Sequence, residues 1–227
     1  MSFLELLPIA LLGAVCGLDF VSFPQAMISR PIIGATAGGA IIGSPSEGLL
    51  IGVVLELLAL DTRPFGASRY PEWGTAGVTG GAVFASTGAG RPGGLAIAVF
   101  ISLVTAMLSG SSMVVLRKLI GARAAATREL IEAGSDRAVV GLQLFGLTAD
   151  LVRGFLLTLV AIALAVPLAR GMVEIWGLPA TFSNAAVIGL AGAVAGGSLW
   201  KFFTAGTRTG WLFLAGLVIG LGFVAVQ

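Results

Sequence analysis

The sequence contains no histidine and a single cysteine, Cys16. Without histidine, the chain itself can form neither a Ser-His-Asp triad nor a histidine metal site, and it cannot carry a phosphohistidine. A lone cysteine can close no intramolecular disulfide and has no companion for a thiolate metal site. Because Cys16 lies in an apolar stretch, we expect a buried, unreactive thiol. We therefore predict neither a metal nor a cofactor.

Charge is also scarce. Charged residues make up 11% of the 227 residues and apolar residues 57%, whereas soluble domains carry roughly 25% charged residues. A water-soluble fold of this size cannot hide so much apolar material. We predict one membrane domain over residues 1–227, an all-α polytopic integral membrane helical bundle. The net charge of +2 is small and the basic residues are scattered, which argues against a nucleic-acid partner.

The apolar stretches differ in length. A helix needs ~20 apolar residues to cross the hydrocarbon core, and this predicts spans at 3–23, 93–116, 147–169, 182–200 and 210–227. The first span lacks a basic n-region and carries Glu5 instead, so we expect it to be retained rather than cleaved as a signal peptide.

Two regions are too short to span comfortably. Residues 31–60 form two apolar runs separated by Ser44-Pro45-Ser46-Glu47, which predicts a re-entrant, broken-helix hairpin or, as the alternative, kinked helices packed in the interior. Residues 75–89 form a further glycine-rich segment that either crosses or re-enters the membrane. Interrupted segments of this kind are typical of transport sites.

Glycines four residues apart indicate closely packed helices. The pairs are Gly13 and Gly17, Gly34 and Gly38, Gly39 and Gly43, Gly48 and Gly52, Gly77 and Gly81, and Gly192 and Gly196. Together they predict a dense bundle and a partner subunit.

Residues 117–146 are the most polar stretch and hold a cluster of arginines. The positive-inside rule places this stretch in the cytoplasm. We expect an amphipathic helix over 120–133 at the cytoplasmic surface, or a solvated linker.

An ionisable residue within a membrane segment is a candidate functional residue. Glu56 lies among leucines, so it must face a cavity, a cation or hydrogen-bond donors; a sugar-binding role and an ion pair with Arg63 or Arg30 are both open. Asp19 is either a functional acid or a cap. Asp150 and Arg153, three residues apart, predict a structural ion pair.

Other polar groups suit a sugar. Gln25 both donates and accepts hydrogen bonds, as a neutral hydroxylated ligand requires. The loop DTRPFGASRYPEW combines aromatic rings with charged groups, which fits either a sugar ring or a membrane interface.

The stretch from residue 15 to 90 resembles the IIC subunit of mannose-family (mannose, fructose, sorbose) sugar phosphotransferase systems. The matching motif runs Gln, Ser-Arg-Pro, a glycine-rich hairpin ending in Gly-x-x-Leu-Glu-Leu, then Gly-Ala and Pro followed by an acid. In this sequence these are Gln25, Ser29-Arg30-Pro31, Gly52 with Leu55-Glu56-Leu57, Gly66-Ala67 and Pro71-Glu72. Glu72 stands where the family has Asp, which implies a smaller pocket or a different sugar.

The resemblance implies a multi-pass channel subunit in the inner (plasma) membrane that works with a IID membrane subunit. Sugar would be phosphorylated by a cytoplasmic IIB protein charged from IIA, so this chain would be a transport subunit and no enzyme. We also expect a homo-oligomer of the IIC–IID unit within membrane lipid. The resemblance implies a substrate site lined by Gln25, Glu56, Gly66, Ala67 and Glu72, supported by Asp19, Arg30 and Arg63.

Two alternatives remain open. One is an ion-coupled secondary transporter with Glu56 as its cation site; the other is a non-transporting regulatory membrane subunit of a degenerate phosphotransferase system. A membrane enzyme is disfavoured because no nucleophile–base pair is evident.

Overall fold

The computed structural model describes residues 3–60, 62, 69–203 and 207–225. The helices are α1 (Phe3–Val21), α2 (Pro31–Ile41), α3 (Pro45–Ala59), α4 (Trp73–Val83), the π-helical turn η1 (Phe84–Gly88), α5 (Gly94–Ala126), α6 (Arg128–Glu132), α7 (Asp136–Glu174), α8 (Ala180–Phe203) and α9 (Thr207–Ala225). No strand occurs within these described ranges. The predicted all-α membrane bundle is confirmed.

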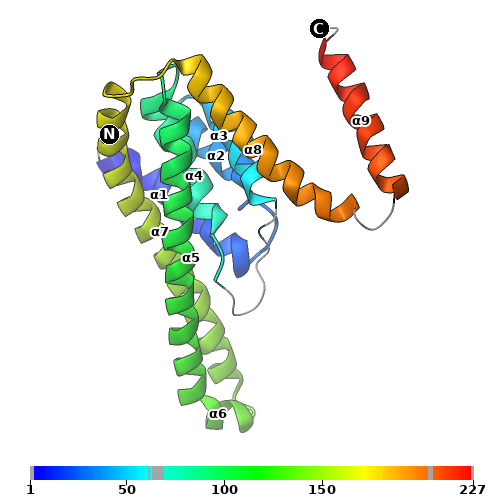
Figure 1. The fold of residues 1–227 in the computed structure, drawn as a ribbon. Helices are drawn as coiled ribbons and strands as arrows, with labels where there is room; N and C mark the ends of the chain where they lie inside the picture. The colour runs from blue at the N-terminus through cyan, green and yellow to red at the C-terminus, as the bar shows by residue number, and fades with distance from the viewer. Residues whose placement is uncertain (1–2, 61, 63–68, 204–206, 226–227) are drawn as a thin grey trace.

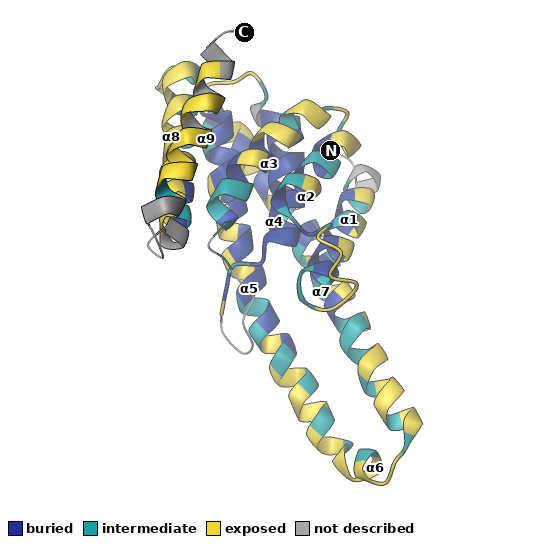
Figure 2. Ribbon diagram, turned by 90° about the vertical axis from the view of Figure 1, so that its right-hand side faces the viewer, coloured by how far each residue is buried: buried dark blue, intermediate teal, exposed yellow. Residues whose placement is uncertain are grey.

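The helices divide into a packed body and two extensions (Figure 1). α1, α2, α3 and α4 gather around one half of the long helices α5 and α7. The other halves of α5 and α7 project from this body as an antiparallel hairpin that α6 closes at its tip. α8 and α9 lie to one side of the body (Figure 2).

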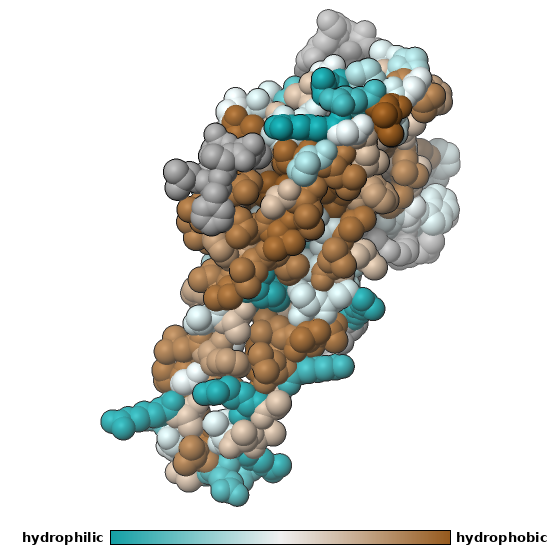
Figure 3. Space-filling model, turned by 90° about the vertical axis from the view of Figure 1, so that its left-hand side faces the viewer, coloured by the Kyte–Doolittle hydropathy of each residue, from teal (hydrophilic) through white to brown (hydrophobic). Residues whose placement is uncertain are grey.

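Three described helices are long and apolar enough to cross a membrane: α5, α7 and Ala180–Trp200 of α8. These helices contain the predicted spans 147–169 and 182–200 in full and the predicted span 93–116 from residue 94 onward. The three predictions are therefore confirmed at the level of helix length and composition. Leu6–Val21 of α1 and Gly210–Gly220 of α9 are shorter apolar helices within the predicted spans 3–23 and 210–227. Figure 3 shows broad hydrophobic surface on the body and hydrophilic side chains gathered toward the α6 tip.

The predicted broken-helix hairpin is present as α2 and α3, joined by a turn in which Gly43 has a φ of 92°. The two helices nearly touch through glycine: a Cβ added at Gly39 would lie 2.7 Å from the Cα of Gly48. Pro31 and Pro45 each stand at the start of their helix, where the missing N–H has no intrahelical partner to lose. The sequence of this hairpin therefore encodes both its break and its close packing.

α4 lies at the centre of the body, and each of its residues is buried. Its neighbours approach its backbone directly: a Cβ on Gly38 of α2 would lie 2.6 Å from the Val78 carbonyl oxygen, and one on Gly81 would collide with the Ala35 carbonyl oxygen. The segment 75–89 is thus an interior helix that ends in the π-helical turn η1.

Two features differ from the sequence predictions. Residues 120–133 are helical and mostly exposed but do not form one helix of their own, because α5 continues to Ala126 and the short helix α6 follows after Thr127. The glycine pair Gly192 and Gly196 on α8 has no atom within 4 Å of an added Cβ, whereas glycines of α2, α3 and α4 contact neighbouring helices. The α8 pair therefore packs against nothing within the described residues.

Candidate functional site

Glu56 and Arg30 form an ion pair where α2 begins and α3 ends. The other carboxylate oxygen, Oε2, lies 3.3 Å from the backbone nitrogen of Ile32, which donates to it. The Glu56 side chain is 19% exposed and that of Arg30 41%. One of the two ion pairs left open by the sequence is therefore formed. Arg63, the other candidate, lies outside the described residues.

The loop before α2 is fastened by Asp19, which is 1% exposed. Its two carboxylate oxygens accept hydrogen bonds from the backbone nitrogens of Ala26 at 2.6 Å and Ser29 at 2.9 Å. Asp19 thereby shapes the loop that carries Gln25 and Arg30, so the capping interpretation describes its observed contacts. Gln25 is exposed, has a φ of 59°, and donates from its amide nitrogen to the Val21 carbonyl oxygen at 2.6 Å.

Glu72 is fully buried and caps the N-terminus of α4. Its Oε1 accepts from the backbone nitrogens of Gly74 at 2.6 Å and Thr75 at 3.2 Å. Its Oε2 accepts from the hydroxyl groups of Thr75 and Ser109, each at 2.5 Å. Four donors offset the cost of burying this carboxylate. The longer acid that departs from the family pattern thus reaches both its own helix and α5.

A buried polar network extends from Glu72 to α7 through Ser109. The guanidinium of Arg153 donates to the hydroxyl of Ser109 at 2.9 Å and to that of Ser112 at 3.1 Å. It also pairs with Asp150 at 2.8 Å, and the Ser22 hydroxyl donates to the other oxygen of Asp150. The predicted Asp150–Arg153 pair is confirmed. Ser109 and Ser112 are not among the site residues expected from the sequence, although two serines three residues apart in an apolar span are a signal for such a contact.

The ends of four helices converge around these groups. A Cβ on Gly74 would collide with the Cys16 carbonyl oxygen of α1, and one on Gly77 would lie 3.1 Å from the Cα of Pro31 at the start of α2. The first turn of α4 therefore lies against both α1 and the segment that holds Arg30. Gly66 and Ala67, the predicted backbone wall of the site, lie outside the described residues.

The described aromatic residues of the loop are packed away. Tyr70 and Trp73 are buried, and the Arg117 guanidinium lies 5.0 Å from the centre of the Tyr70 ring. Burial raises the pKa of the Tyr70 phenol, and the neighbouring Arg117 opposes this shift. Neither ring presents a free face in this conformation.

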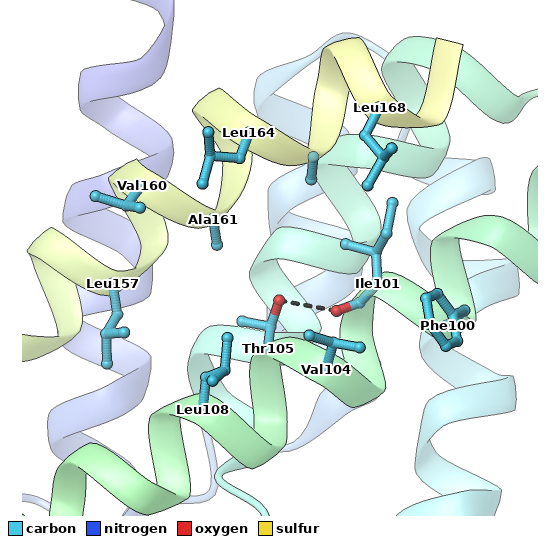
Figure 4. A pocket seen from close by; sticks show the side chains of 11 residues that line it. Phe100, Ile101, Val104, Thr105, Leu108, Leu157, Val160, Ala161, Leu164 and Leu168 are labelled. Carbon is cyan, nitrogen blue, oxygen red and sulfur yellow. Dashed lines mark hydrogen bonds between the residues drawn. The ribbon is translucent and has the colours of Figure 1, made fainter. Parts of the chain in front are cut away.

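A groove of about 210 Å³ between α5 and α7 offers a contrast to the polar cluster (Figure 4). Leucine, valine, isoleucine, alanine and phenylalanine line it, together with Thr105, whose hydroxyl donates to the Ile101 carbonyl oxygen at 2.8 Å. This lining suits an apolar group and offers a sugar almost no hydrogen bonds. No group of histidine, cysteine, aspartate or glutamate in the described part of the chain could hold a metal ion.

The fold and the buried polar cluster define an all-α membrane protein with ionisable groups held inside its bundle. A solved structure described as "Structure of membrane protein" has the same fold, with a TM-score of 0.70 and 17% sequence identity over 100% of this chain and 97% of that chain. A search of curated proteins found no match. The model of the family "PTS system sorbose-specific iic component" matches residues 3–199. The chain therefore belongs to this family of sugar phosphotransferase membrane components.

Proposed function

We propose that this chain is the channel subunit of a phosphoenolpyruvate-dependent phosphotransferase system and passes a hexose-type sugar to a cytoplasmic IIB protein for phosphorylation. Membership of the family supports a sugar-specific membrane component. The observation that carries the proposal is the partly exposed Arg30–Glu56 pair at the ends of the broken hairpin. An acid and a guanidinium side by side supply the acceptors and donors that neighbouring sugar hydroxyls need.

Glu56 has spare capacity in this arrangement. A carboxylate can accept about four hydrogen bonds, and Oε2 has a single long contact to Ile32. We assign Glu56 to the sugar hydroxyls, with Arg30 as the donor beside it and Gln25 as a second two-way contact. The Gly66–Ala67 wall stays part of the proposed site. A direct sugar contact by Glu72 stays a prediction, since its observed donors come from α4 and α5.

The proposed subunit works with IID in the membrane, and phosphoryl groups reach the sugar through IIA and IIB. The absence of histidine agrees with phosphorylated histidines that lie on those partners. We place the chain in the inner membrane as a multi-pass protein, with the α6 tip in the cytoplasm because arginines cluster near it. Homo-oligomers of the IIC–IID unit complete the proposal.

The experiment reconstitutes this chain with IID, IIB, IIA and the phosphocarrier in vesicles and measures uptake of labelled sorbose, mannose and fructose. We expect uptake that requires phosphoenolpyruvate and stops in Glu56→Gln, while the variant still inserts. Glu47→Gln, on the first turn of the same helix α3, is the matched control and should transport normally.

Other results would select the alternatives. Uptake that persists without a phosphate donor and follows a proton gradient would show an ion-coupled transporter and overturn the proposal. Normal sugar binding and uptake by Glu56→Gln would overturn the site assignment.

A further inference from the structure

A second polar pocket lies at the opposite end of α4 from the Glu56 site. Its volume is about 290 Å³, which is at the small end for ligand pockets and fits a monosaccharide-sized molecule. It is lined by Ala85, Ser86, Thr87, Ala89, Arg91, Arg170 and Glu174. These residues come from the π-helical turn η1, the loop before α5 and the last turns of α7. Nothing in the proposed transport site uses them.

The three segments are held together by packing. The indole of Trp176, just after α7, covers Gly93 so closely that any Cβ there would collide with it. Gly93 also has a φ of 73°, a conformation that favours glycine. Since Arg91 stands two residues before Gly93, this contact fixes the Arg91 loop beside the end of α7, which carries Arg170 and Glu174.

Two hydroxyl-bearing residues of the π-helical turn, Ser86 and Thr87, line the pocket. The Ser86 and Thr87 hydroxyls both donate to the Val83 carbonyl oxygen, at 3.2 Å and 2.7 Å. A hydroxyl has one proton to donate, so each keeps only its lone pairs for a ligand.

The charged groups supply the complementary donors. Each arginine carries five N–H donors in a planar fork that matches a carboxylate, and two arginines against Glu174 leave the pocket with one net positive charge. No ion pair within the described residues joins Arg91 or Arg170 to an acid. The pocket therefore contains two guanidinium groups without an ion-pair partner among the residues described, on Arg91 and Arg170, and hydrogen-bond acceptors on Ser86, Thr87 and Glu174.

We propose that this pocket binds a sugar acid, a monosaccharide-sized polyol with one carboxylate. The carboxylate lies on Arg91 and Arg170, and hydroxyl groups of the ligand donate to Ser86, Thr87 and Glu174. A neutral sugar leaves the guanidinium charge without a partner, and a bare anion leaves the acceptors unused. In the proposed orientation the pocket faces the outside of the cell. The site goes beyond the proposed transport function and does not depend on Glu56.

The test is a titration of the purified full chain in uncharged detergent. D-gluconate, D-glucitol and acetate are each added in turn, and binding is measured by thermophoresis. We expect gluconate to bind at least tenfold more tightly than glucitol, which lacks the carboxylate, and than acetate, which lacks the polyol. Arg170→Gln should weaken gluconate at least tenfold, and Arg91→Gln on the loop gives a second, independent loss. Arg128→Gln on α6 is the matched control and should bind as the parent chain does.

The remaining outcomes overturn the inference. Equal affinity for gluconate and acetate would mean a plain anion site, and displacement of gluconate by a few per cent of phosphatidylglycerol would mean a lipid headgroup site. Binding that survives both arginine substitutions would lie elsewhere. Glu56→Gln separates the two proposals: it should leave gluconate binding unchanged, and a loss there would assign gluconate to the transport site instead.

Discussion

Replacing Glu72 tests whether this acid holds the bundle together or touches the sugar. In Glu72→Ala, the backbone nitrogens of Gly74 and Thr75 lose their acceptor, as does the Ser109 hydroxyl. Loss of an N-cap costs about 1 kcal/mol and at most about 2, and loss of a hydrogen bond to a charged group costs roughly 1.5–3 kcal/mol. We expect a total of about 3–5 kcal/mol in the free energy of unfolding.

The assay is thermal unfolding of the purified chain in detergent, with the inserted fraction measured in membranes. A loss of this size lowers the unfolding temperature by on the order of 10 °C for a chain of this length. Glu47→Ala is the control, since Glu47 also stands in the first turn of a helix, α3, whose N-cap residue Ser44 makes no side-chain cap. It should change the unfolding temperature little.

The opposite pattern would refute this reasoning. If Glu72→Ala unfolds at the temperature of the parent chain while sugar binding is lost, the acid acts on the sugar and its cap contributes little. Glu72→Gln adds a second measurement, because it keeps the volume and one acceptor but removes the charge. It should destabilise the chain less than alanine does.

Two further predictions concern packing and the buried ion pair. Gly81→Ala forces a Cβ into the Ala35 carbonyl oxygen and should cost about 1–3 kcal/mol, whereas Gly192→Ala, with open space around it, should be neutral or stabilising; equal unfolding temperatures would contradict this. Arg153→Ala leaves Asp150 buried without its partner and should cost about 3–5 kcal/mol. The double alanine variant should recover part of that loss, and a strictly additive double-mutant cycle would show that the pair is uncoupled.

Much of the helical architecture can be predicted from the sequence because a membrane restricts the lengths and the composition of the helices that cross it. The length of an apolar run sets which helices can span, and Pro45 after a short run marks the break between α2 and α3. The glycine spacing identified helices that approach closely, since only glycine permits the contact between Gly39 and Gly48. The membrane environment thus makes helix number and packing faces predictable.

Tertiary contacts decided what the sequence left open. Nothing in the chain order distinguishes Arg30 from Arg63 as the partner of Glu56, because one arginine shortly precedes the helical hairpin and the other shortly follows it. Ser109 links Glu72 at the start of α4 to Arg153 of α7. Hydrophobic periodicity cannot predict a contact between residues so far apart in the sequence. The polar stretch after residue 117 is mostly exposed, as expected, but α5 continues through it to Ala126 in spite of Gly121, so the sequence did not show where the long helix ends.

The close packing at the centre of the body also limits which substitutions α4 can accept. After Trp73, α4 consists mainly of small residues, and its glycines lie against the backbones of α1 and α2, so a larger side chain at these glycines has no space. This crowding leaves the loops and helix ends around α4 as the places where a substitution can reshape the site without displacing the central helix.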